Sequence, residues 1–111
     1  MRVAFEDHDT ISLVRLEGDF TFEHVDAFRR AVTDRIERGI RDFVLVVEGV
    51  EFIDSEGLET LLWLQDESAT MLGQIRLVGC QPGLLTILEV VRLEQQFESC
   101  ESTTGAVKSL R

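Results

Sequence analysis

The segment Ile53-Asp54-Ser55-Glu56-Gly57-Leu58 holds the side chains most suited to chemistry in this chain of 111 residues. The hydroxyl of Ser55 can act as a nucleophile if a neighbouring base takes its proton, or it can accept a phosphate from another enzyme. A serine hydrolase needs a histidine beside the serine, and neither His8 nor His24 has a spacing that places it there. We therefore expect no catalysis, so that Ser55 is either a modification site or a simple helix cap, a role worth about 1 kcal/mol.

The other reactive side chains do not form a recognisable site. The two cysteines, Cys80 and Cys100, make neither a C-x-x-C motif nor a zinc pattern with the histidines, so we expect reduced, structural thiols. The chain also lacks the glycine-rich loop that holds nucleotide phosphates. No metal and no cofactor are predicted.

The charge balance restricts the class of partner. With 21 acidic and 11 basic residues the net charge is −10, which disfavours nucleic acids and anionic membranes, whereas a basic protein partner is compatible with it. Acidity is also a common route to solubility. No apolar run approaches the roughly 20 residues that cross a bilayer, and the N-terminus lacks the apolar segment of a signal peptide. We expect a cytoplasmic protein without membrane insertion.

The elements that would position Ser55 alternate between strand and helix, which is typical of a sheet covered by helices. The length fits one domain, residues 1–111. The apolar run 43–47 predicts a central parallel strand, because such a run suits a strand that is buried on both faces. The other expected strands are 2–6, 11–17, 75–78 and 96–98, and the expected helices follow Thr21, Ser55 and Pro82 and occupy 101–110.

The helix after Ser55 has both an expected buried face and an expected binding face. Ser55 would be its N-cap, and Gly57 would leave the first turn open to a large partner. Tryptophan is favoured at binding hot spots, so the Ser55 loop and this helix are expected to form one recognition surface. The buried face would comprise Leu58, Leu61, Leu62, Ala69 and Leu72, up to a stop at Gly73, whereas Trp63, Leu64 and Met71 would lie off it.

Several separated segments match one pattern in order and spacing. They are Leu16-Glu17-Gly18-Asp19, 44–48, 50–62, 73–79 and 88–93, and the most specific is Ile53-Asp54-Ser55-Glu56-Gly57-Leu58. In these segments the chain resembles the STAS family, named for sulfate transporters and anti-sigma factor antagonists. The resemblance implies an α/β fold, with a mixed β-sheet of four to five strands and about four helices packed largely on one side.

In the bacterial antagonists of this family, the serine after the aspartate is phosphorylated by a partner that is both anti-sigma factor and serine kinase. The unphosphorylated antagonist binds the kinase and frees the sigma factor, and a serine phosphatase reverses the modification. The resemblance thus implies a phosphoprotein that regulates transcription, modified at Ser55. Glu56 departs from the pattern, because many antagonists have a second serine there. The residues expected to contact the partner are Asp19, Asp54, Glu56, Gly57, Leu58, Thr60, Trp63 and Leu64.

A second function fits the same resemblance. STAS domains also serve as structural subunits that dock on the ATPase of an ABC transporter, or within stress-sensing scaffolds. Stable binding that is insensitive to Ser55 would identify this role. The sequence also leaves open whether the chain forms a homodimer or another STAS–STAS assembly.

Overall fold

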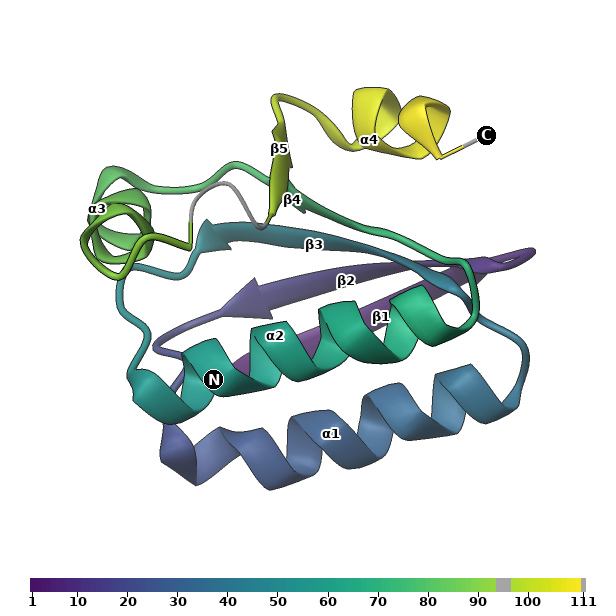
Figure 1. The fold of residues 1–111 in the computed structure, drawn as a ribbon, viewed down its shortest axis with the longest axis horizontal. Coiled ribbons are helices and arrows are strands. Elements are labelled where there is room, and N and C mark those ends of the chain that lie inside the picture. The colour runs from purple at the N-terminus through teal and green to yellow at the C-terminus, as the bar shows by residue number, and fades with distance from the viewer. Residues whose placement is uncertain (94–96, 111) are drawn as a thin grey trace.

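The structure is a computed structural model that describes residues 1–93 and 97–110, and its strands and helices alternate along the chain (Figure 1). No helix in these residues is long and apolar enough to span a membrane. The elements are β1 (Arg2–His8), β2 (Ile11–Glu17), α1 (Phe22–Glu37), β3 (Asp42–Gly49), α2 (Ser55–Thr70), β4 (Ile75–Val78), α3 (Pro82–Val90), β5 (Glu98–Cys100) and α4 (Thr103–Ser109).

The five strands form one mixed sheet in the order β1-β2-β3-β4-β5. β1 is antiparallel to β2, whereas β2, β3, β4 and β5 run parallel to one another. The apolar run 43–47 is buried and lies in β3 at the centre of the sheet, which confirms the central parallel strand. Because β2, β3 and β4 are parallel, the loops that follow them meet at one end of the molecule.

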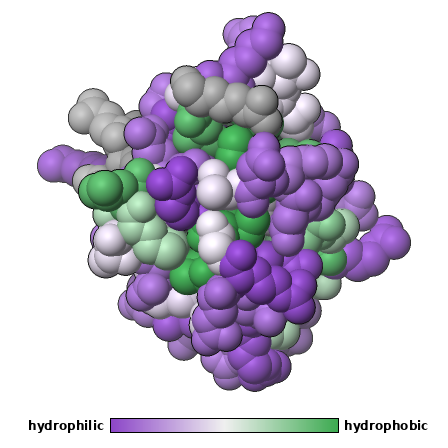
Figure 2. Space-filling view, turned by 90° about the vertical axis from the view of Figure 1, so that its right-hand side faces the viewer, coloured by the Kyte–Doolittle hydropathy of each residue, from purple (hydrophilic) through white to green (hydrophobic). Residues whose placement is uncertain are grey.

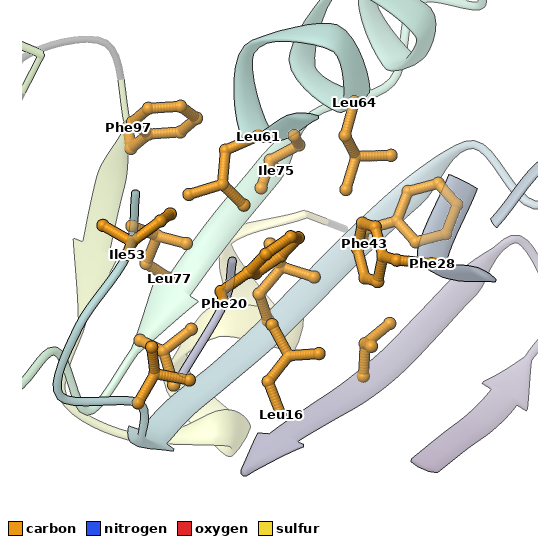
Figure 3. Close-up of a cluster of buried hydrophobic side chains, with 14 of the residues drawn as sticks. Leu16, Phe20, Phe28, Phe43, Ile53, Leu61, Leu64, Ile75, Leu77 and Phe97 are labelled. Atoms are coloured by element: carbon orange, nitrogen blue, oxygen red, sulfur yellow. The ribbon is translucent and has the colours of Figure 1, made fainter. Parts of the chain in front are cut away.

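One face of the sheet carries the main hydrophobic core. α1 and α2 lie side by side across this face (Figure 1), and Leu84 and Leu88 of α3 complete the same cluster. Figure 3 shows side chains from strands, loops and helices converging there. Alternation along β3 explains the arrangement, since Phe43 and Leu45 point into this cluster and Val44 points to the other face.

The opposite face is covered by one short helix. Ala106 of α4 is buried against Val44, Val46 and Val78, and Figure 1 shows α4 on the side of the sheet away from α1 and α2. Arg76, also on this face, donates through Nε to the hydroxyl of Ser109 at 3.0 Å. The expected α/β fold, a mixed sheet with helices largely on one side, is confirmed.

Most of the elements predicted from the sequence are present, with shifted ends. The strand expected at 2–6 extends to His8, and the last helix is shorter than 101–110. The strand expected at 96–98 begins at Glu98, and residue 96 lies outside the described residues.

The buried face predicted for α2 was wrong in part. The residues that the helix buries are Gly57, Thr60, Leu61, Leu64 and Ser68. Leu64, expected to lie off the core, has no exposed surface, whereas Ala69, expected to be buried, is exposed. The buried stripe is therefore rotated relative to the prediction, because small and hydroxyl residues occupy part of the helix face that meets the sheet.

The end of α2 also differs from the expected glycine stop. Leu72, and not Gly73, has the left-handed conformation that closes the helix, with φ +62° and 90 % of its side chain exposed. Gly73 N donates to the carbonyl of Ser68 at 2.7 Å, one residue further along the same closing motif. A Cβ at Gly73 would lie 2.0 Å from the carbonyl oxygen of Arg41, so glycine is needed there for close backbone approach.

Candidate functional site

The loops that follow β2 and β3 are held together at the carboxyl end of the sheet. Phe20 and Ile53 form an isolated parallel bridge beyond the strands. Phe20 N donates to the carbonyl of Phe52 at 3.0 Å, and Asp54 N donates to the carbonyl of Phe20 at 3.2 Å. The side chains of Phe20 and Ile53 point into the core (Figure 3), so core packing fixes the position of the backbone before Ser55.

Asp54 joins the N-termini of the two long helices. Its Oδ1 accepts a hydrogen bond from Gly57 N at 2.8 Å, which makes Asp54 the N-cap of α2. Its Oδ2 accepts from Phe22 N, the first residue of α1, also at 2.8 Å. Each helix N-terminus carries a partial positive charge, so one carboxylate satisfies donors from both. The expectation that Asp54 shapes the loop agrees with this geometry.

Ser55 is therefore not the N-cap that the sequence predicted. Asp54 has extended backbone angles (φ −92°, ψ −178°) and stands outside the helix, whereas Ser55 is its first residue. The Ser55 side chain is exposed, and its hydroxyl has no hydrogen-bond partner within residues 1–93 and 97–110. The hydroxyl is thus free to meet a partner or to accept a phosphate.

Gly57 has a different role from the one expected. It is buried, and a Cβ there would lie 2.4 Å from the carbonyl oxygen of Phe20 and 2.6 Å from Cγ1 of Ile53. Glycine is needed because α2 starts directly against the loop after β2. Gly57 therefore sets the position of Ser55 from inside the protein and leaves no opening for a partner.

Two further residues expected to contact the partner are buried. Thr60 has no exposed surface, and its hydroxyl donates to the carbonyl of Glu56 at 2.8 Å. Leu64 is part of the core, as described above. The prediction that their side chains face a partner was wrong, because both lie on the side of α2 that packs onto the sheet.

The remaining predicted contact residues reach the surface to different extents. Asp19 and Glu56 are exposed, whereas Leu58 is half-buried and packs against the core. Trp63 is also half-buried against the core, and the guanidinium carbon of Arg29 lies 5.1 Å from the centre of its ring. The accessible part of the predicted surface thus centres on Ser55 and Glu56.

Sequence reasoning missed two aromatic side chains beside Ser55. Phe22, whose N–H binds Asp54, is 61 % exposed, and Phe52, whose carbonyl binds Phe20, is 48 % exposed. They are the only phenylalanines among the seven in the chain that the structure marks as largely exposed. The sequence contains a sign of their exposure, because each phenylalanine is next to a glutamate. Both also lie outside the apolar strands, close to the start of a predicted helix.

The other candidate reactive groups form no hydrogen bond with Ser55 in the described part of the chain. His8 Nε2 is 3.0 Å from a Glu6 oxygen, and His24 Nε2 is 3.3 Å from the N-terminal amine. Burial raises the pKa of the Cys80 thiol above its usual value, and Cys80 and Cys100 are both free thiols. The described residues contain no group of three acidic, histidine or cysteine side chains able to hold a metal ion.

Comparison with known proteins agrees with the fold. The model of the STAS domain matches residues 2–106. A STAS-domain containing protein of Pseudomonas aeruginosa (strain UCBPP-PA14) is 31 % identical over 85 residues, which are 77 % of this chain and 83 % of that protein. The crystal structure of the Thermotoga maritima protein TM1081 superposes with a TM-score of 0.90 at 19 % identity, covering 98 % of this chain and 94 % of that one.

The anti-sigma factor antagonist SpoIIAA is also similar in structure. Its unphosphorylated form gives a TM-score of 0.87 at 18 % identity, over 99 % of this chain and 96 % of that one. The phosphorylated form of SpoIIAA, from Bacillus, gives 0.78 at 17 % identity, over 99 % and 100 %. From the match to the family model and the sequence relative, this chain belongs to the STAS domain family.

Proposed function

We propose that this STAS domain is an anti-sigma factor antagonist that binds an anti-sigma factor serine kinase and is released when the kinase phosphorylates Ser55. A serine phosphatase would restore the binding form. The observation that carries the proposal is the exposed Ser55 hydroxyl, free of hydrogen bonds to the described residues, at the first position of α2. The similar protein SpoIIAA has both an unphosphorylated and a phosphorylated form, which supports the same switch here.

The charges around Ser55 favour a direct block of binding. A phosphate adds about 1.5 to 2 negative charges. The segment 48–63 contains Glu51, Glu56 and Glu59 and no lysine or arginine, so the phosphate would have no cation of this segment to bind. The helix N-terminus offers only about 0.3–1 kcal/mol of stabilisation to an anion, and Asp54 already accepts the hydrogen bond of one N–H donor there, Gly57 N. The phosphate would then prevent binding by its presence in the surface that contacts the partner, and the fold of this domain would stay unchanged.

We also infer that the chain acts by binding and not by catalysis. A serine nucleophile needs a base within hydrogen-bond reach. The two histidines of the chain contact Glu6 and the N-terminal amine, and neither has a contact with Ser55. The phosphoryl transfer would belong to the kinase, which supplies the nucleotide.

Phosphorylation in vitro tests the proposal. The wild type and the variants Ser55→Ala and Ser99→Ala are incubated with purified anti-sigma factor serine kinases from the source organism and ATP, and the modified residue is mapped by mass spectrometry. Ser99 is the control because it is an exposed serine on β5, away from the loops that follow β2 and β3. We expect Ser55 to be modified in the wild type and in Ser99→Ala, and no modification of Ser55→Ala. An unmodified wild type, or full labelling of Ser55→Ala, would refute the switch.

A binding measurement separates the two functions that the family suggests. Wild type and Ser55→Glu are compared for affinity to the same kinases and to the ATPase of an ABC transporter. Loss of kinase binding in Ser55→Glu agrees with the antagonist. A stable complex with the ATPase that Ser55→Glu leaves unchanged would instead identify a structural subunit.

A further inference from the structure

The end of the molecule that contains Ser55 is mainly acidic, with Arg2 and the N-terminal amine as positive groups beside it. Three segments meet there, 16–28, 48–63 and 79–91, because each follows or includes the carboxyl end of a parallel strand. The first two are joined by the bridge between Phe20 and Ile53, and the third by a 2.7 Å hydrogen bond from Gln81 Nε2 to the carbonyl of Glu48. These segments contain four, five and one acidic residues, ten of the chain's 21, and none of its 11 lysines and arginines.

Most of this charge is neither buried nor neutralised within the protein. Of the ten acidic side chains only Asp54 is half-buried, and the other nine are exposed. Glu17 pairs with Arg2 at 3.2 Å, and no other acidic residue of the three segments forms an ion pair within the described part of the chain. The arginines of α1 begin only at Arg29, towards the other end of the helix, which is the end that faces the viewer in Figure 2. The basic residues of α1 therefore lie away from its first turn, which is next to Ser55.

Exposed apolar side chains lie within this acidic field. Phe22 is next to Asp54 because its N–H binds the Asp54 carboxylate, and Phe52 is two residues before Asp54 in the same loop. Leu85 of α3 is also exposed, at 39 %. The first turn of α3 lies close to the residue before Phe52, since a Cβ at Gly83 would be 3.0 Å from the carbonyl oxygen of Glu51. Aromatic anchors surrounded by polar groups are the usual composition of an interface centre and its rim.

We propose that the partner of the Ser55 surface is a protein with a basic contact surface and apolar pockets that accept Phe22 and Phe52. The inference rests on the proposed function, because it takes the surface around Ser55 as the binding surface. The charge disfavours a second copy of this chain in symmetric contact, since that contact would place the same acidic residues opposite one another. It equally disfavours nucleic acid and anionic lipid.

The two parts of the surface contribute to different rate constants. Long-range attraction between an acidic and a basic surface raises the association rate constant and weakens as salt screens it. Removal of a buried aromatic anchor acts mainly on the dissociation rate constant. Glu51, Glu56 and Glu59 are therefore expected to control association, and Phe22 and Phe52 to control dissociation.

The test measures both rate constants by surface plasmon resonance with the purified kinases, from about 50 to about 500 mM NaCl, a range over which the screening length falls severalfold. The triple variant Glu51→Gln, Glu56→Gln, Glu59→Gln is compared with Glu37→Gln, Asp66→Asn, Glu101→Gln. The control triple changes the net charge equally at exposed residues outside the three segments. We expect association in low salt to slow about tenfold in the first triple and to stay within about twofold of wild type in the control.

The aromatic residues complete the test. Phe22→Ala and Phe52→Ala should each raise the dissociation rate constant about tenfold or more, with little change in association. Equal effects of the two triple variants on the association rate constant, or a wild-type dissociation rate constant in both phenylalanine variants, would overturn this inference. The proposed function would still stand in that case if Ser55→Glu abolished binding. Absence of binding by wild type would overturn both. Self-association that Phe52→Ala abolishes would assign the surface to a second copy and overturn the basic partner.

Discussion

Replacement of Asp54 by alanine should destabilise the protein, because this carboxylate bonds to the N-termini of two helices. The variant loses both carboxylate hydrogen bonds, to Gly57 N and to Phe22 N, each 2.8 Å long. Loss of an N-cap costs about 0.5–2 kcal/mol. A hydrogen bond to a charged group contributes about 1.5–3 kcal/mol, and the lower limit applies to the exposed bond at Phe22. Together these values give a loss of roughly 2–3 kcal/mol, since the two effects share one side chain.

Urea denaturation followed by circular dichroism measures this loss, and the m-value should stay unchanged because the fold is kept. The series Asp54→Ser, Asp54→Asn and Asp54→Ala separates the two bonds. Serine can still cap Gly57 but is too short to bind Phe22 as well, so Asp54→Ser should lose only the bond to Phe22, about 1.5 kcal/mol. Hydrogen exchange should accelerate at the Phe22 amide in all three variants.

Ser55→Ala is the matched control, because the two residues are neighbours and both types cap helices well. Its exposed hydroxyl has no partner in the described residues, so the variant should stay within about 0.5 kcal/mol of wild type. A loss in Ser55→Ala as large as that in Asp54→Ala would show that serine caps the helix. Wild-type stability in Asp54→Ala would refute the bridging role of the carboxylate.

Four further predictions follow from the packing. Gly57→Ala should lose about 3 kcal/mol or more in urea denaturation, because its Cβ would lie 2.4 Å from the carbonyl oxygen of Phe20. Leu72→Gly should gain about 0.5–1 kcal/mol by relieving the left-handed backbone (φ +62°), whereas Leu72→Ala should gain nothing because alanine has the same strain. Trp63→Ala should lose about 1–2 kcal/mol, since the half-buried ring packs on the core and carries a cation–π contact; wild-type stability would place its role at the surface. The rate of Cys80 alkylation by iodoacetamide, measured in Cys100→Ser, should keep rising above pH 9.0. Burial raises the pKa of the Cys80 thiol, so little reactive thiolate is present at lower pH, and a plateau of the rate below pH 9.0 would contradict this.

The sheet could be predicted from the sequence because its signals are local and strong. The run 43–47 is apolar at every position and rich in β-branched residues, which suits a strand buried on both faces, and the structure places it between two parallel strands. The first two strands are close in sequence and their turn residues lie between them. Their register required no long-range information.

The phase of α2 could not be predicted from hydrophobicity alone. Gly57, Thr60 and Ser68 occupy the buried face, where small side chains let the helix approach the sheet and the neighbouring loop. A pattern based on leucine and alanine is therefore only partly right: Leu61 is buried as expected, but Ala69 is exposed. Thr60 can be buried because its hydroxyl bonds to the preceding turn of its own helix, a contact that hydropathy does not describe.

The residue that ends α2 could not be predicted for a related reason. Glycine near a helix end usually supplies a left-handed backbone, and Gly73 was assigned that role. The structure gives the left-handed position to Leu72 and uses Gly73 where the chain passes Arg41. Close approach depends on a segment more than 30 residues away in the sequence, so no local pattern reveals it.

The competition between two neighbouring caps decides what Ser55 can do. Both Asp54 and Ser55 carry an oxygen able to accept a first-turn N–H, and a serine that served as the cap would hold its hydroxyl in an internal hydrogen bond. Asp54 is favoured because its two oxygens reach donors of two helices at once, which a single hydroxyl cannot do. The structural task is thus complete without the serine, and its side chain is exposed, as are those of Phe22 and Phe52 in the neighbouring loops. Stability gives no reason for a serine at this position, so the reason must be sought in what approaches the surface from outside.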